Sequence, residues 1–172
     1  MSDSHLAPKI PLVGIGYDVH QFIAGRPLFL GGVEIAYEFG LDGHSDADVL
    51  IHAIADAILG AIGEKDIGHH FPNTDPAFKG ISSVELLKKV VVLVQAAGGR
   101  ILNIDSSLVA EAPKIGPHVA KMRDILSTAL GLPAARVGIK ATTNESMGFV
   151  GRKEGIAAFA VASVLMPDLP LA

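Results

Sequence analysis

The run from Ser45 to Ile62 constrains the fold of this 172-residue chain more than any other segment. Its apolar residues recur at the spacing of one helix face, behind a Ser45-Asp46 pair suited to cap a helix, and glycines end the run. Strand-like runs precede and follow it along the chain. The pattern therefore predicts a mixed α/β layer fold.

Elements of both kinds alternate along the rest of the chain. The run 155–166 fits either a helix or a strand, because alanine dilutes both periods. The segment 66–80 is long for a connection without regular structure, which favours a functional loop. The strands before the long helix are expected to form a hairpin, and no linker divides the chain. Strands are predicted at 12–19, 28–35 (interrupted by Gly31-Gly32), 100–111 and 137–141, and further helices at 84–97 and 117–130.

Composition excludes several classes of protein. The absence of cysteine rules out disulfides, thiolate metal sites and cysteine nucleophiles. Any metal ion would therefore be bound by His and carboxylate side chains. A net charge of -4 with scattered Lys and Arg argues against nucleic-acid binding. The apolar runs are shorter than the roughly 20 residues of a membrane span, and residues 1–11 lack a signal-peptide core, so a cytoplasmic protein is expected. At 49% hydrophobic residues, part of the apolar surface is expected to lie between subunits.

The triplet Asp18-Val19-His20 is the first candidate for chemistry. On a strand, the period of two places the Asp18 carboxylate and the His20 imidazole on one face, where His52 on the long helix could complete three ligands. This is the composition of a catalytic zinc site with one open position. The alternative is a chance pairing, since structural histidines are common.

Polar residues around the long helix allow two interpretations each. Asp48, His52 and Asp56 lie four residues apart, so a carboxylate could orient the His52 ring, or the stripe could simply face water. The sequence Gly43-His44-Ser45-Asp46 opens the helix, where free N–H groups favour a phosphate. A plain capping sequence is the alternative, and it leaves His44 without a role.

Two later segments carry similar alternatives. The run from Lys140 to Glu145 combines typical phosphate ligands with a carboxylate able to hold Mg²⁺, or it is a polar turn with a salt bridge. The run from Ala110 to Gly116 has small residues that would let the backbone approach a planar base, or it simply connects a strand to a helix.

Together these segments resemble the 2-C-methyl-D-erythritol 2,4-cyclodiphosphate synthase family. The likeness extends from Val13 to Val164 without large gaps. The motifs that carry it are Asp18-Val19-His20, His44-Ser45-Asp46 with Asp48, His52, Asp66-Ile67-Gly68, Phe71-Pro72-Asn73-Thr74-Asp75-Pro76, Ala112-Pro113-Lys114, Lys140-Ala141-Thr142-Thr143-Asn144-Glu145 and Gly151-Arg152 with Glu154-Gly155-Ile156.

The resemblance implies a lyase of the non-mevalonate isoprenoid pathway. Family members convert 4-diphosphocytidyl-2-C-methyl-D-erythritol 2-phosphate to 2-C-methyl-D-erythritol 2,4-cyclodiphosphate and release CMP. The substrate's own phosphate is the nucleophile, so the protein supplies positioning and charge neutralisation. The chain would then form one catalytic domain at 11–166, with a flexible extension at 1–10 and a tail at 167–172.

The resemblance also implies roles for individual residues. Asp18, His20 and His52 would hold one Zn²⁺ per subunit, and Glu145 a Mg²⁺ or Mn²⁺ that bridges the diphosphate. His44 and Thr143 would stabilise the transition state. The substrate-binding residues would be Ser45, Asp66, Ile67, Gly68, Phe71, Pro72, Asn73, Thr74, Asp75, Ala110, Glu111, Ala112, Pro113, Lys114, Ile115, Gly116, Lys140, Thr142, Asn144, Phe149 and Arg152.

A homotrimer is implied as well, with a mixed sheet backed by helices in each subunit and the sheets around a central channel. Each active site would lie between neighbouring subunits, the run 155–166 would be a strand, and the channel would bind an isoprenoid diphosphate through Arg152. The chain departs from the family pattern at Asn73, where many members have Asp, and at Phe159, where some have Glu.

Two other classes of function remain open. In a zinc hydrolase the open metal position would hold water, with Glu145 or Asp56 as the base; the intact segment from Thr142 to Glu145 argues against this. A trimeric module that binds a nucleotide or isoprenoid around a structural metal, without catalysis, is the second alternative.

Overall fold

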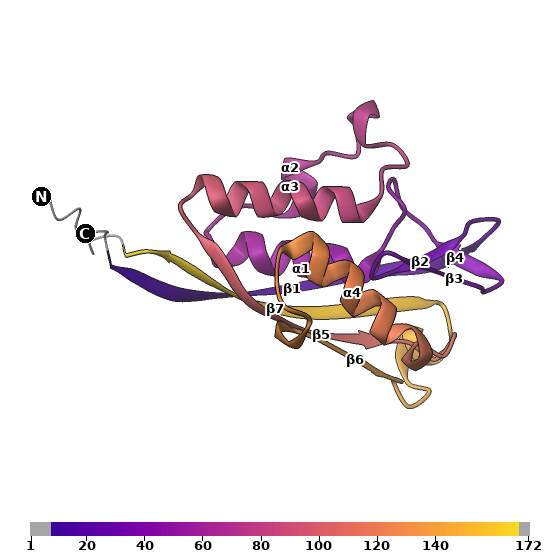
Figure 1. The fold of residues 1–172 in the computed structure, drawn as a ribbon. Helices are drawn as coiled ribbons and strands as arrows, with labels where there is room; N and C mark the ends of the chain where they lie inside the picture. The colour runs from indigo at the N-terminus through magenta and orange to yellow at the C-terminus, as the bar shows by residue number, and fades with distance from the viewer. Residues whose placement is uncertain (1–7, 169–172) are drawn as a thin grey trace, which may run out of the picture.

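The fold is a mixed sheet with helices on one face (Figure 1). The structure is a computed structural model that describes residues 8–168. Its five-stranded sheet has the order β4-β1-β7-β5-β6, in which β5 and β6 are parallel and the other neighbours antiparallel. The mixed α/β prediction is confirmed. The strands are β1 (Lys9–Ala24), β4 (Phe39–Leu41), β5 (Arg100–Val109), β6 (Val137–Thr142) and β7 (Gly155–Pro167).

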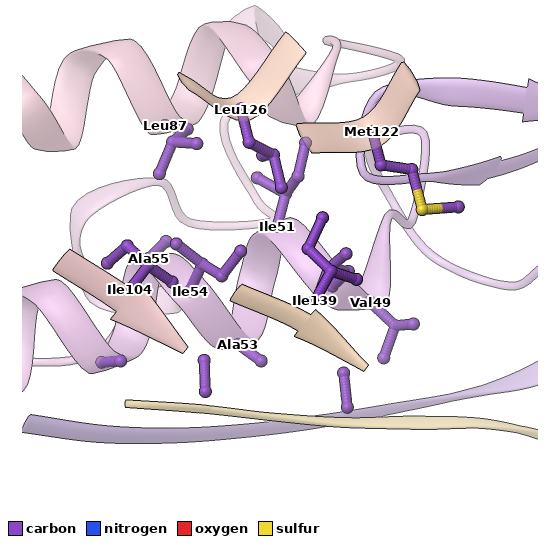
Figure 2. Close-up of a cluster of buried hydrophobic side chains, with 14 of the residues drawn as sticks. Val49, Ile51, Ala53, Ile54, Ala55, Leu87, Ile104, Met122, Leu126 and Ile139 are labelled. Carbon is purple, nitrogen blue, oxygen red and sulfur yellow. The ribbon is translucent and has the colours of Figure 1, made fainter. Parts of the chain in front are cut away.

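The helices build the core above the sheet. α1 lies directly on β1 and β7, and α3 packs on α1 and α4. Figure 2 shows where these layers meet, with Ile51 and Ile54 of α1 beside Leu87 of α3 and Leu126 of α4. Within residues 8–168, no helix has the length and apolarity needed to cross a membrane. The helices are α1 (Val49–Ala61), α2 (Ile67–His70), α3 (Ser83–Ala96), α4 (Val119–Leu130) and α5 (Gly148–Gly151), with single 3-10 turns at Pro76–Phe78, Gly116–His118 and Ala134–Arg136.

Two glycines of β1 bring α1 unusually close to the sheet. A Cβ atom at Gly14 would lie 2.1 Å from the carbonyl oxygen of Ala57, and one at Gly16 would lie 2.0 Å from that of Ala53. Both distances are much shorter than van der Waals contact. The backbone of α1 therefore occupies the space that side chains at positions 14 and 16 would need. This contact places His52, the neighbour of Ala53, above the end of β1.

The strand predictions need two corrections. β1 pairs with β7 and β4, so the expected hairpin between 12–19 and 28–35 is wrong. Residues 28–35 instead fold on themselves as the hairpin β2 (Leu28–Leu30) and β3 (Val33–Ile35). Gly31 and Gly32 have φ angles of 58° and 76°, the conformation that a two-residue hairpin turn requires. The ambiguous run 155–166 is the strand β7.

The ends of the chain also differ from expectation. Lys9 and Ile10 belong to β1, and Pro167 belongs to β7, where Lys9 pairs with Pro167. The flexible extension and tail therefore do not include these positions. Of the other positions in the two expected flexible ends, Pro8 accepts a backbone hydrogen bond from the Asp168 N–H at 2.7 Å, and residues 1–7 and 169–172 lie outside the described residues.

Candidate active site

Asp18, His20 and His52 come together where the C-terminal half of β1 passes beneath α1. Asp18 and His20 share the helix-facing side of the strand, and α1 supplies His52. The Asp18 Oδ2 atom lies 3.0 Å from His20 Nε2 and 3.0 Å from His52 Nδ1, and the two ring nitrogens are 3.2 Å apart. One ligand atom from each residue lies within 4.8 Å of the others, as a metal centre requires.

The charges of this triad favour a bound cation. Burial works against ionisation of Asp18, but hydrogen bonds from His20 and His52 outweigh it and hold the pKa of Asp18 well below its usual range. Burial likewise opposes a charged His20, but the hydrogen bond to Asp18 prevails and raises the pKa of His20. The carboxylate therefore stays ionised and draws positive charge to this point.

The outer nitrogen of His20 shows that the residues fit a metal ion. Its Nδ1 atom lies 2.5 Å from the carbonyl oxygen of Asp42, which can only accept, so Nδ1 carries the proton. Nε2 is the ring nitrogen that faces Asp18, so it is the one placed to bind a metal ion. A backbone carbonyl that fixes the tautomer in this way is a regular companion of histidine ligands.

The side chains of Asp48 and Asp56 make no hydrogen bond to His52, so the expectation that a helix carboxylate orients its ring is wrong. Asp48 is fully buried as the N-cap of α1 and accepts hydrogen bonds from the N–H groups of Gly31, Gly32 and Ile51 at 2.7–3.1 Å. Asp56 accepts from the Ile67 N–H at 2.7 Å. Neither faces water as a free stripe, because backbone donors from outside the helix engage both.

Two serines lie at the outer nitrogen of His52. Its Nε2 atom is 3.2 Å from Ser45 Oγ and 2.9 Å from Ser83 Oγ. Ser83 is the first residue of α3 and is completely buried. Sequence reasoning missed it, because a serine at a helix start is indistinguishable from an ordinary cap until the fold brings it to His52.

Arg26 supports the turn that carries His44. Its guanidinium donates to the carbonyl oxygens of Gly43 at 2.5 Å and of Ser45 at 2.6 Å, one on each side of His44. This turn precedes α1 rather than capping it, since Asp48 is the cap. Arg26 was also missed, because nothing local distinguishes a single arginine between two strands.

A pocket of about 210 Å³ opens in front of the triad. The turn at 43–45 forms one wall, and the segment 66–80 contributes Ile67, Gly68, Phe71 and Asn73. Other predicted loop residues have local roles: Asp66 caps α2 through the His69 N–H, and Asp75 caps the 3-10 turn through the Ala77 N–H. Pro72 and Thr74 do not line the pocket.

Most of the predicted residues of the segment 110–116, with Thr142 and Thr143, line a second pocket of about 340 Å³. It shares no lining residue with the first pocket. Ala112 and the side chains beyond Thr143 are not among its lining residues. Its walls are Ala110, Glu111, Pro113, Lys114, Ile115, Gly116 and Pro117, with Ala141, Thr142 and Thr143.

Glu111 shapes the turn beside this second pocket. Its Oε1 atom accepts hydrogen bonds from the N–H groups of Asn144 and Ser146, both at 3.0 Å. Glu145 has a φ angle of 51° and accepts a hydrogen bond from the Thr143 hydroxyl at 2.9 Å. The segment is thus a polar turn, as the simpler alternative required, but one that exposes Thr143 and Glu145 together.

Two predicted anion ligands already have carboxylate partners. The Lys140 ammonium pairs with Asp105 on the neighbouring strand. The Arg152 guanidinium donates to both oxygens of Glu154, at 2.7 and 3.2 Å. Phe149 lies on α5 and is partly exposed. These three residues line neither pocket.

Comparison with known proteins points to one family. Residues 12–165 match the model of the YgbB family. The chain is 59% identical over 160 residues to the 2-C-methyl-D-erythritol 2,4-cyclodiphosphate synthase of Akkermansia muciniphila, covering 92% of this chain and 95% of that protein.

Solved structures agree. The fold matches a CDP complex of IspF from Plasmodium falciparum with a TM-score of 0.79 and 32% identity, over 92% of this chain and 97% of that one. It matches the bifunctional IspDF from Campylobacter jejuni with a TM-score of 0.89 and 42% identity over 94% of this chain, which spans 44% of that longer protein.

Proposed function

The chain belongs to the YgbB family, and on this premise we propose that it converts 4-diphosphocytidyl-2-C-methyl-D-erythritol 2-phosphate to 2-C-methyl-D-erythritol 2,4-cyclodiphosphate and CMP. The observation that carries the proposal is the Asp18, His20 and His52 triad in a pocket beside the His44 turn. The step is an intramolecular phosphoryl transfer, so a lyase of this kind needs ordered charges and donors rather than a protein nucleophile.

The triad supports Zn²⁺ as the resident ion, one per subunit. One carboxylate and two imidazoles are a typical catalytic zinc ligand set, which leaves a position for substrate. When bound, the ion acts as a Lewis acid on a phosphate oxygen. Glu145, exposed next to the Thr143 hydroxyl, supports a second ion such as Mg²⁺ or Mn²⁺ on the diphosphate.

The chain's own donors account for the rest of the chemistry. Arg26 holds the carbonyls on both sides of His44, which fixes the position of His44 on the pocket wall. His44 and the Ser45 hydroxyl are then placed to donate to phosphate oxygens as negative charge builds on them. Thr143 would donate from the nucleotide side, and the loop residues Phe71 and Asn73 would bind the methylerythritol portion.

Both pockets are needed for one substrate. Volumes of about 210 and 340 Å³ lie at or below the lower end of the range for small-molecule sites, and a nucleotide-linked substrate is large. The second pocket, between Ala110 and Thr143, suits the cytidine, and the first suits the phosphorylated sugar alcohol. A complete site therefore calls for the second pocket of one chain to face the first pocket of another.

An exposed apolar face supports a homotrimer. The side of β1 and β7 away from the helices carries Val13, Ile15 and Val161 at 68%, 73% and 43% exposure. Tyr17 and Phe159 pack against each other on this face, with ring centroids 4.8 Å apart and ring planes tilted by 45°. Apolar area of this kind is typical of a subunit interface, and three such faces would surround a channel.

An isoprenoid diphosphate in that channel would have to compete for Arg152. The bidentate contact with Glu154 raises the pKa of Arg152 and occupies its guanidinium. Both side chains are more than half exposed, so this pair is weak and a diphosphate would displace Glu154 at little cost.

Product analysis tests the proposal. The purified protein is incubated with the substrate, Zn²⁺ and Mg²⁺, and phosphorus NMR is expected to show the cyclodiphosphate and CMP in equal amounts. CMP with an uncyclised diphosphate would instead support a hydrolase that activates water. Binding of CDP without any turnover would support a non-catalytic module.

A further inference from the structure

Asp56 joins the helix that carries His52 to the start of the substrate loop, the segment 66–80. It lies on α1 one turn after His52, and its side chain is half-buried. Its Oδ1 atom accepts a hydrogen bond from the Ile67 N–H at 2.7 Å. Ile67 is the first residue of α2 and lines the pocket in front of the triad. A single side chain therefore links the helix of His52 to a wall of that pocket.

This hydrogen bond is distinct from the cap of α2. Asp66 is the N-cap and accepts a hydrogen bond from the His69 N–H at 2.9 Å, whereas Asp56 accepts from Ile67, two residues earlier. With only four residues, α2 is too short to be stable without contacts to the rest of the protein. Asp66 belongs to the loop and moves with it, so it cannot fix α2 relative to the pocket. Asp56 can, because it belongs to α1.

The other end of the substrate loop is held at the turn before α1. The Gly80 N–H donates to the His44 carbonyl at 2.9 Å, and the Asp46 N–H donates to the Ile81 carbonyl at 3.1 Å. The loop is thus attached at both ends to the segment 44–56. The two attachments are independent, because a side chain makes the first and backbone groups make the second. A substitution at position 56 therefore releases one end only.

We propose that Asp56 is a positioning residue that holds Ile67, Gly68 and Phe71 in place for the methylerythritol portion of the substrate. All three residues line the pocket in front of the triad. The effect on substrate rests on the proposed function, but the attachment itself is a property of the chain. These residues would contact the sugar alcohol and not the reacting phosphorus. They would therefore bind substrate and transition state equally, which affects KM rather than kcat.

Steady-state kinetics test this role. Asp56→Ala removes the acceptor of the Ile67 N–H, so KM is expected to rise about 10-fold while kcat stays within about threefold of the wild-type value. Asp56→Asn retains a side-chain oxygen that can accept from Ile67, and its KM should return close to that of the wild type. The metal content should not change, because Asp56 is not among the hydrogen-bond partners of the His52 ring. Asp124→Ala, which removes an exposed carboxylate from α4 outside both pockets, is the matched control.

Partial digestion of the whole protein with trypsin measures the attachment directly, without substrate. Lys65 and Lys79 are both exposed, one near each end of the loop. Cleavage requires the backbone to open locally, so release of Ile67 should expose the bond after Lys65. Asp56→Ala is expected to be cut there about 10-fold faster than the wild type. Cleavage after Lys79 should be unchanged, because the hydrogen bond from Gly80 to the turn before α1 remains.

Any of three results overturns the proposal: equal cleavage after Lys65 in Asp56→Ala and the wild type, a KM in Asp56→Ala equal to that of Asp124→Ala, or no recovery of KM in Asp56→Asn. Failure of the proposed function looks different. In that case the wild type would form no cyclodiphosphate, while the difference in cleavage after Lys65 between the wild type and Asp56→Ala would remain.

Discussion

The two pockets of the chain are constructed in different ways. The one around the triad is fixed by side chains from β1, α1 and α3 that hold one another, with Asp48 and Ser83 fully buried behind it. The one beside β6 is shaped mostly by backbone turns at the surface, which a single carboxylate, Glu111, holds in place. The side chains of the first pocket are hydrogen-bonded to other residues of the same chain, whereas Thr143 and Glu145 beside the second pocket are exposed.

This difference indicates a division of labour. A metal centre tolerates little movement of its ligands, so its supports must be rigid before substrate arrives. A nucleotide pocket can be completed by a neighbour, because its specificity comes from backbone groups and shape. We therefore expect substitutions in the first pocket to act through the metal ligands, and substitutions in the second to act through its contact with a neighbouring subunit.

The largest effect is expected for His52→Ala. It removes one of three ligands, so the metal content should fall from one zinc per chain to none and cyclisation should fall to background. Elemental analysis and the product assay measure both. His118→Ala, which removes a histidine from a 3-10 turn, should retain its metal; a metal-free His52→Ala protein with full turnover would contradict the assignment.

Subunit complementation tests whether the pockets of different chains meet. His52→Ala and Glu145→Gln are each expected to be inactive alone. Unfolded together and refolded as mixed trimers, they should regain about a quarter of wild-type turnover, because a site then needs an intact metal half and an intact neighbouring half. The readout is CMP release after mixing.

The same experiment can also show that the two pockets of one chain serve a single active site. If both pockets of one chain served one site, every mixed site would carry a defect and no activity would return. Mixing each variant with itself gives the baseline.

A smaller effect is expected for Arg26→Met. The loss of two charge-assisted hydrogen bonds should let the His44 turn move, and a displacement of about 1 Å costs up to about 100-fold in rate. We expect kcat to fall about 10- to 100-fold with little change in folding. Arg26→Lys should recover only part, since an ammonium cannot form the fork; Arg100→Met on β5 serves as the control.

The mildest test uses pH. In the metal-free protein, the lowered pKa of Asp18 contributes stability at pH values above 3.8, the ordinary pKa of Asp. The raised pKa of His20 contributes stability at pH values below 6.5, the ordinary pKa of His. The His20 contribution is lost as pH rises through its raised pKa. Metal binding displaces that proton, so zinc stabilises more as pH rises, by at most about 1.4 kcal/mol per pH unit.

Melting curves with and without zinc measure this. The Tm gain from zinc should be larger at about pH 8 than at about pH 6, by a few degrees for each kcal/mol. An equal gain at both values would mean that no proton leaves when the metal binds.

The sequence predicts best what depends on neighbours along the chain. The long helix and the shared face of Asp18 and His20 follow from local periodicity, whereas the loop residues near the triad follow from the family resemblance. The residue at which the long helix begins does not follow from the sequence. Ala47 has a φ angle of 58°, which is not helical, so α1 begins only after Asp48, its N-cap. Propensity alone gives no sign of that turn.

Contacts between distant segments account for what was missed. The pairing of β1 with β7 joins residues at the two ends of the chain, and Ser83 reaches His52 only after α3 has packed on α1. Asp48 appeared to be a partner for His52 because helical spacing ignores the hairpin turn at Gly31-Gly32, whose N–H groups compete for that carboxylate.

The bare backbone at Gly14 and Gly16 couples protein engineering of the core to metal chemistry. A methyl group at Gly16 could be accommodated only if α1 slid or lifted, and His52 would travel with it while Asp18 and His20 stayed on β1. A variant there can therefore be well folded and still lack the arrangement of Asp18, His20 and His52 that a metal ion needs. Because Gly14 and Gly16 lack a Cβ atom, α1 can approach the sheet closely enough to bring His52 to Asp18 and His20.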